Sequence, residues 1–201
     1  MIKLCPKVPE KDLLNVFIKL QKDEQDSVRM HGVESCILFA QKLSPTMATT
    51  HLVPIIQSFS EDKSWRIRYV VADRIIDLAN ELSQPSNKET LLNFYITFLT
   101  ESESEVRSAA CRRLSEFAKI FESKNIIDKI IPSFEKLQKD QFVYVRSAFA
   151  ENILALCPLI GKAATTQYIL PAFLVLLRDE SSEVRLSLLK RLDDLNSIIG
   201  I

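Results

Sequence analysis

Glycine is scarce in this sequence, and the scarcity excludes a class of binding sites. Gly32, Gly161 and Gly200 are the only three among 201 residues. Loops that cradle phosphate groups need clustered glycines, so the common nucleotide-binding motifs are excluded. Excess charge is also missing, because Lys plus Arg and Asp plus Glu both number 26. Binders of nucleic acid or of membrane surfaces usually carry a clear basic excess, so we expect neither as a partner.

Paired metal ligands and catalytic groupings are missing too. The sequence has four cysteines at long, irregular gaps and no CxxC pair, so it offers no zinc site of the usual spacing. His31 and His51 are the only histidines, and neither has a nucleophile or an orienting acid nearby in the sequence. We therefore expect no metal, no cofactor and no enzymatic activity. The cysteines are Cys5, Cys36, Cys111 and Cys157.

Long hydrophobic runs are absent as well. The longest apolar stretch, Tyr168 to Leu177, has ten residues and contains Pro171, which is too short to span a bilayer. The first residues contain no extended apolar segment of the kind found in secretory signals. We therefore expect reduced thiols and a cytoplasmic location, with the nucleus as a second compartment.

A strict internal repeat is the main positive signal. A β-branched residue followed by Arg recurs five times at intervals of 39 residues. An acidic residue stands six positions before each Arg, and large apolar residues stand nine and twelve positions before it. Further apolar columns lie four and seven positions after it. The five arginines are Arg29, Arg68, Arg107, Arg146 and Arg185.

The spacing within each repeat predicts two helices joined by a short polar turn. Apolar residues at helical intervals occur both before and after the turn, and neither helix can bury its apolar face alone. A helix pair of about 40 residues is typical of HEAT or armadillo proteins, and Pro in the first turn of the first helix favours HEAT. The predicted fold is an all-α, right-handed solenoid forming one domain over residues 1–201. Its repeats are approximately 8–44, 45–83, 84–122, 123–161 and 162–201.

The recurring acid and Arg have two interpretations, a structural ladder and direct partner contact. The structural interpretation is favoured, because a binding residue need not recur in every repeat. The acid can accept backbone N–H bonds at the start of the second helix, and the Arg can reach the acid of a neighbouring repeat. The ladder is predicted to contain Arg29, Asp62, Arg68, Glu101, Arg107, Asp140, Arg146, Asp179 and Arg185. Cys36, Cys111 and Cys157 fall in the apolar core columns, so we expect them to be buried.

Turn residues that break the pattern are the candidates for partner binding. Trp65, the only tryptophan, lies beside Arg66, and this pair has the composition of an interface hot spot. The alternative, that Trp65 folds down onto its own stack, remains open. Phe142 and Tyr144 make the fourth turn too apolar for a solvated one. The first and third turns are acidic and could pair with a basic surface. The alternative, a solvated acidic helix start, is favoured for the third turn.

Two of these turns resemble a known family. Residues 23–29 and 61–73 are similar to turns of the scaffold (A) subunits of protein phosphatase 2A, and the resemblance continues through 156–162 and 179–201. It implies HEAT repeats from the middle of a longer array, on the side that holds a regulatory B subunit. A catalytic subunit would be held only by further C-terminal repeats. The partner-binding residues that the resemblance implies are Asp23, Glu24, Gln25, Asp26, Lys63, Ser64, Trp65 and Arg66.

The leading hypothesis is therefore a non-catalytic phosphatase scaffold segment, and the alternative is a HEAT adaptor for a transport or trafficking assembly. An enzyme is disfavoured because the sequence offers no site with a perturbed acid or base. The last helix, residues 186–199, keeps its apolar columns without a polar cap. We expect the resulting apolar end face to promote self-association, as in a solenoid cut within its array.

Overall fold

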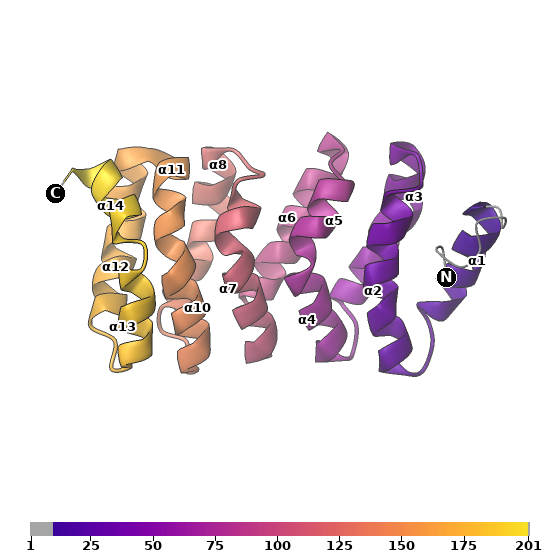
Figure 1. Cartoon of the computed structure of the whole chain (residues 1–201), viewed down its shortest axis with the longest axis horizontal. Coiled ribbons are helices and arrows are strands. Elements are labelled where there is room, and N and C mark those ends of the chain that lie inside the picture. Colours follow the sequence, from indigo (N-terminus) through magenta and orange to yellow (C-terminus); the bar gives the residue numbers. More distant parts are fainter. Residues whose placement is uncertain (1–9, 201) are drawn as a thin grey trace. The chain divides into compact units, whose positions relative to one another are not determined.

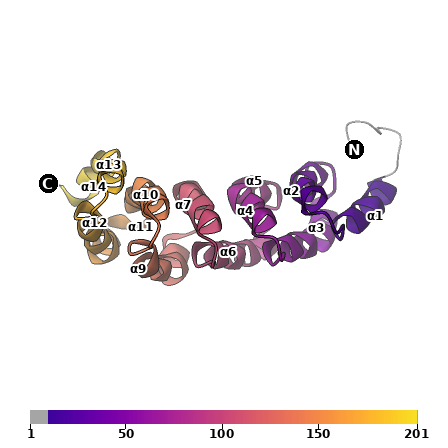
Figure 2. The same cartoon turned by 90° about the horizontal axis from the view of Figure 1, so that it is seen from below.

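The computed structural model describes residues 10–200, and every element in that range is helical. Cys5 lies outside the described residues. Contacts group the chain into two compact units, residues 1–94 and 95–201, which divide inside helix α6. Within each unit, the first helices of the repeats form one layer and the second helices form another (Figure 2). This arrangement confirms the all-α fold of stacked helix pairs.

The N-terminal unit contains two complete helix pairs. The first pair is α1 and α2, and in the second pair the helix after the turn is split at Arg74 (Figure 1). Helix α3 begins where the Ser44 hydroxyl accepts the Met47 N–H and Pro45 occupies the first turn, where a missing N–H costs nothing. The elements are α1 Glu10–Leu20, α2 Asp26–Ala40, α3 Pro45–Ser60, α4 Trp65–Asp73, α5 Ile75–Glu81 and α6 Pro85–Leu99.

The C-terminal unit continues the same plan with less regular first helices. The turns that lead into α7, α10 and α13 lie along one edge of this unit (Figure 1). The elements are α7 Ser104–Ala118, α8 Ser123–Asn125, η1 Ile126–Ile130, η2 Ile131–Ser133, α9 Phe134–Leu137, α10 Val143–Ile153, η3 Leu154–Leu156, α11 Cys157–Ala164, η4 Thr165–Ile169, α12 Leu170–Leu177, α13 Ser182–Leu189 and α14 Leu192–Ile199.

The core is built from the repeated apolar columns. All five residues twelve positions before the Arg are buried, and the rings of Tyr95 and Phe117 stack with centroids 4.0 Å apart. Cys36, Cys111 and Cys157 are buried as expected. The columns after the turn are buried in the first four repeats, but Leu189 and Leu192 of the fifth are 44% and 38% exposed.

The prediction that the recurring prolines lie in the first turn of the first helix is wrong for Pro54, whereas Pro132 and Pro171 are the second residues of η2 and α12. Pro54 is the tenth residue of the sixteen in α3. Pro132 and Pro171 each follow a π-helical turn, η1 and η4 respectively. Proline has no N–H and its ring collides with the carbonyl four residues earlier, so the hydrogen bonds there shift to a wider spacing. The first helices begin earlier than the proline column predicted, and polar residues occupy their first turns.

The link between the second and third pairs is short, although residues 83–88 are polar apart from Pro85. Helix α6 already begins at Pro85, and Asn87 in its first turn is only 2% exposed. The Asn87 amide donates hydrogen bonds to the Leu82 carbonyl and to the Thr49 hydroxyl, which satisfies it. A polar residue in a helical first turn is therefore buried with its hydrogen bonds satisfied.

One stretch of the described chain, Val143–Leu177, is long and apolar enough by composition to cross a membrane. It is not one straight helix. Gly161 has φ +79° and ψ 171°, and the chain reverses direction there between the fourth and fifth pairs. Arg146, Asn152 and Thr165 lie buried along it. The stretch therefore consists of two helices whose apolar faces build the core.

Candidate functional site

Each turn is held by the Arg of its own repeat. In all five repeats the guanidinium Nη1 donates to the backbone carbonyl of the residue six positions earlier. The distance is 2.6 Å from Arg29 to the Asp23 oxygen and 2.7 Å from Arg107 to the Glu101 oxygen. These carbonyls belong to the turn, two or three residues after the first helix ends, so the Arg ties the turn to the second helix. The other pairs are Arg68 with Asp62, Arg146 with Asp140, and Arg185 with Asp179.

The same arginines also join neighbouring turns. Nε and Nη2 of Arg29 donate to the two carboxylate oxygens of Asp62 at 2.8 and 3.0 Å. Arg107 holds Asp140 at 2.7 and 3.0 Å, and Arg146 holds Asp179 at 2.6 and 3.0 Å. Each pair spans 33 residues. A planar guanidinium can hold a carboxylate with one edge and a carbonyl with another, which Lys cannot do.

Each acid of these pairs also fixes the turn that leads into its own second helix. Asp62, Asp140 and Asp179 each accept a hydrogen bond from the backbone N–H two residues later, at 2.8 to 3.0 Å. Glu101 instead bonds the N–H of Ser102, because its side chain is one methylene longer. Every one of the three Asp residues therefore has fixed partners on two neighbouring turns. Their geometry leaves them little freedom to reach a ligand.

These ion pairs are mostly buried and shift the acidity of their members. The side chains of Arg146 and Asp179 are 9% and 7% exposed. Burial alone would raise the pKa of the Asp179 carboxyl, but the hydrogen bonds from Arg146 and the Ser181 N–H lower it below its usual range. The pKa of Asp62 is lowered by the same balance. The hydrogen bond to Asp62 raises the pKa of Arg29.

The first two turns make one surface on the N-terminal unit. The Ser64 hydroxyl donates to the Asp26 carboxylate at 3.2 Å, which joins the starts of α2 and α4. Trp65 is half-buried, and the Arg66 guanidinium lies over its ring, 5.0 Å from the centroid. Trp65 is therefore partly packed on its own stack and partly available to a partner. Of the other implied residues, Glu24, Gln25 and Lys63 are exposed and Asp23 is half-buried, bonding the Gln25 N–H.

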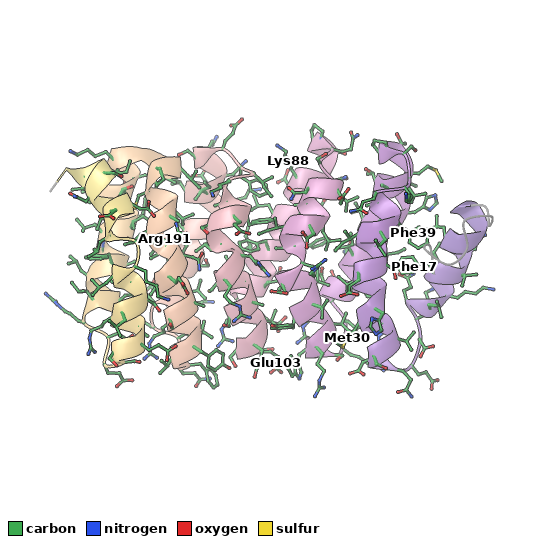
Figure 3. The ribbon with its side chains drawn as sticks, in the orientation of Figure 1. Phe17, Met30, Phe39, Lys88, Glu103 and Arg191 are labelled. Atoms are coloured by element: carbon green, nitrogen blue, oxygen red, sulfur yellow. The ribbon has the colours of Figure 1, made fainter. Side chains whose placement is uncertain are left out.

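The fourth turn places two aromatic rings at the surface of the C-terminal unit. Phe142 and Tyr144 are 37% and 41% exposed, and their ring centroids lie 5.5 Å apart. The Tyr144 hydroxyl and the Ser104 hydroxyl are 2.5 Å apart, which joins this turn to the third. Glu103 precedes Ser104 and lies at the edge of the unit, where the turn enters α7 (Figure 3). The rings therefore form a fixed feature at the molecular edge.

The cysteines in the core are buried thiols. Burial raises the pKa of the Cys36 and Cys111 thiols, which keeps them protonated and unreactive. Within residues 10–200, no group of three or more His, Cys, Asp or Glu side chains is placed to hold a metal ion. Within each unit, the turns present polar and aromatic side chains at the surface.

Comparisons with known proteins agree with this architecture. Residues 86–161 match the family model described as PPP2R1A-like HEAT repeat. Over 98% of its length the chain superposes on 38% of the crystal structure of Cex1p, with a TM-score of 0.78 and 17% sequence identity. It also matches 84% of the MAST/Orbit N-terminal domain with a TM-score of 0.60 and 18% identity. The match is therefore to HEAT repeats over residues 86–161, and the two solved structures share the helical fold.

Curated relatives narrow the class further. The chain is 36% identical over 129 residues to the beta isoform of the human 65 kDa regulatory (A) protein of serine/threonine-protein phosphatase 2A. It is 40% identical over 148 residues to a probable phosphatase PP2A regulatory subunit of Caenorhabditis elegans. These matches cover 62% and 74% of this chain, and 22% and 25% of the relatives. The resemblance to phosphatase 2A scaffold subunits is confirmed, and the chain spans about a quarter of their length.

Two contacts of the turns could not be found from the sequence. The bond from each Arg to a backbone carbonyl has no sequence signature on the acceptor side, because every residue has a carbonyl. The Tyr144 to Ser104 bond joins residues that are not in a repeated column. The only hint was the apolar character of the fourth turn, which marked Tyr144 but not its partner.

Proposed function

We propose that this chain is a non-catalytic scaffold segment of a protein phosphatase 2A-like complex, binding a regulatory subunit through its intra-repeat turns. The similarity to the 65 kDa regulatory (A) proteins of phosphatase 2A carries the proposal. Those relatives are regulatory rather than catalytic by name, which supports a role without enzymatic activity. The proposed location is the cytoplasm and the nucleus.

The turn geometry supports this role. Asp26, Ser64, Trp65 and Arg66 lie on two adjacent turns that a hydrogen bond holds together. Stacking on Trp65 restrains Arg66, so less side-chain entropy is lost when a partner binds. Trp and Arg supply a large share of the binding energy in protein interfaces. We expect these four residues to contact the regulatory subunit directly.

A binding assay with purified phosphatase subunits tests the proposal. The immobilised chain is presented in separate runs with a regulatory and with a catalytic subunit, and the affinity is measured. We expect the regulatory subunit to bind and the double variant Trp65→Ala with Asp26→Ala to weaken binding at least about tenfold. Leu38→Ala, an exposed apolar residue of α2 away from the turns, is the matched control and should leave the affinity unchanged.

Two outcomes would count against this function. Unchanged regulatory-subunit binding by the double variant would remove these turns from the interface. Binding to a transport or trafficking cargo, with no affinity for either phosphatase subunit, would favour the alternative of a HEAT adaptor for another assembly.

A further inference from the structure

The exposed aromatic pair of the fourth turn is not explained by packing. Phe142 and Tyr144 keep more than a third of their surfaces exposed, although the fourth repeat buries its other aromatic residues. The rings contact each other, and the Tyr144 hydroxyl is tied to Ser104. Their neighbours in the turn, Gln141 and Val143, carry no charge. Two restrained apolar rings at a protein surface are a common feature of binding sites.

The charges around this pair are one-sided. The three turn segments of the C-terminal unit, residues 101–107, 140–146 and 179–185, contain seven acidic residues and three arginines. The arginines already bond carbonyls of their own turns, and Arg107 and Arg146 also hold Asp140 and Asp179. The surface that remains is therefore acidic on both sides of the rings.

Individual contacts place these acids on the two turns that adjoin the fourth turn. Ser104, which bonds Tyr144, lies between Glu103 and Glu105 in the sequence. On the other side, Arg146 joins the fourth turn to Asp179 and to Glu180, whose side chain is 89% exposed. Glu183 is exposed at the start of α13. Carboxylates thus flank the aromatic pair on both neighbouring turns.

The turns of the N-terminal unit provide a contrast within the same chain. Residues 23–29 and 62–68 together contain four acidic and four basic residues. There the aromatic residue Trp65 already has a cation, Arg66, over its ring. The fourth turn has aromatic rings and surrounding carboxylates, but its own Arg146 is engaged by the Asp140 carbonyl, Asp179 and Glu180. A cation from a partner would complete the same arrangement.

From this complementarity we infer that the fourth turn binds a basic, apolar segment of a partner protein. An apolar side chain of that segment packs against Phe142 and Tyr144. Its Arg or Lys residues lie over the rings and face the flanking carboxylates of Glu103, Glu105, Glu180 and Glu183. The inference rests on the proposed scaffold function, because it names the chemistry of the segment that one turn of the scaffold binds.

A peptide titration tests the inference on the whole chain. The probe is a fluorescently labelled synthetic peptide of alternating arginine and leucine residues, and its matched control replaces every arginine with glutamate. We expect saturable binding of the basic peptide that weakens with added salt, because salt screens exposed charges. The acidic peptide should not bind. Equal binding of the two peptides, or no binding of the basic one, would overturn the inference.

Variants locate the site. Phe142→Ser combined with Tyr144→Ser should weaken basic-peptide binding about tenfold, and Glu103→Gln combined with Glu183→Gln should weaken it and reduce the salt dependence. Tyr144→Phe keeps the ring and should bind nearly as well as the wild type. Circular dichroism checks that each variant is folded. The glutamine variant leaves the apolar packing intact, so the charge requirement is tested even if the serine variant fails to fold.

The N-terminal unit provides the control that separates this inference from the proposed function. Trp65→Ala should leave peptide binding unchanged while weakening regulatory-subunit binding. If Trp65→Ala and the serine variant reduce peptide binding equally, the peptide is not bound at the fourth turn and the inference is wrong. If only regulatory-subunit binding is absent, the proposed function fails while the chemistry of the fourth turn still stands.

Discussion

At the scale of single residues, one Arg per repeat does two structural tasks. It holds the turn of its own repeat through a backbone carbonyl, and in three repeats its other edge holds the Asp of the next turn. The ion pairs are mostly buried, so removing one partner leaves the other desolvated without compensation. The stability of the fold is therefore predicted to require the planar shape of the guanidinium as well as its charge.

Arg107→Lys should therefore destabilise the chain although the charge is kept. A lysine ammonium cannot hold the Asp140 carboxylate and the Glu101 carbonyl with separate edges, so we expect a loss of about 1 to 2 kcal/mol. Urea unfolding followed by circular dichroism measures it. The exposed Arg178→Lys is the control, and equal stabilities of the two variants would contradict the prediction.

The lowered pKa values of Asp62 and Asp179 predict acid sensitivity. A carboxyl with a lowered folded-state pKa stabilises the fold above its unfolded pKa of about 3.9, and this stability is lost as the pH falls through the folded value. Asp179→Asn should be less stable than the wild type at neutral pH and should lose less stability below about pH 4. Thermal midpoints across the acid range measure both effects, and parallel curves would refute the assignment.

Sequence columns predicted residue positions better than residue contacts. The 39-residue period placed Arg29 and Asp62 in columns that meet, because stacked repeats bring equivalent positions together. The columns could not predict the carbonyl partner of each Arg, nor the Tyr144 to Ser104 bond. The period carries information only on what repeats, whereas the aromatic turn is a departure from the repeat.

At the scale of elements, helices were predicted correctly in number per repeat but not in detail. The apolar spacing identified both helices of each pair. It could not show that the first helix begins earlier, since its first turn is polar and resembles a linker. Nor could it show the π-helical turns before Pro132 and Pro171, because these arise from missing hydrogen bonds rather than from apolar spacing.

The turn between the fourth and fifth pairs depends on the backbone conformation of Gly161. Its φ of +79° and ψ of 171° belong to a region that is essentially restricted to glycine. A Cβ there would meet no atom within 4 Å, so Gly161→Ala introduces no steric clash. We expect a destabilisation of about 1 to 3 kcal/mol from backbone strain alone, measured by urea unfolding. A neutral effect would mean that the turn relaxes.

Gly32 provides a contrasting case within a helix. A Cβ at this position would lie 2.6 Å from the buried Phe59 ring. Gly32→Ala gains about 1 kcal/mol of helix propensity but must displace that ring, which typically costs about 1 to 3 kcal/mol. We expect a net loss of stability, seen as a lower thermal midpoint. An increase in the midpoint would show that the ring moves without cost.

At the scale of the whole molecule, the fifth repeat differs from the others in what it leaves exposed. The two columns that hold buried residues in the first four repeats hold the exposed Leu189 and Leu192 here. Leu174 and Leu192 also line a cavity of about 450 Å³ between α12 and α14. The single continuous domain expected from the sequence stays a prediction, since the contacts define two units.

The exposed columns predict concentration-dependent self-association of this chain. Exposed apolar area of this kind is removed from water when two copies meet, which is favourable by about 25 cal/mol per Å². Leu189→Glu combined with Leu192→Glu should shift the chain toward monomer in sedimentation velocity, whereas Leu38→Glu on α2 should not. A wild-type chain that remains monomeric at high concentration would contradict this expectation.

Because the ion pairs all span the same number of residues, a whole repeat can be removed or added without breaking their register. Arg107 and Arg146 each reach an Asp 33 residues ahead, within a period of 39. Excision of one whole period, residues 123–161, would bring Asp179 to the position that Asp140 now occupies opposite Arg107. The ladder therefore tolerates gain or loss of entire repeats, while a deletion of any other length breaks it. Such a chain can change its length in evolution and keep the same Arg–Asp contact between neighbouring turns.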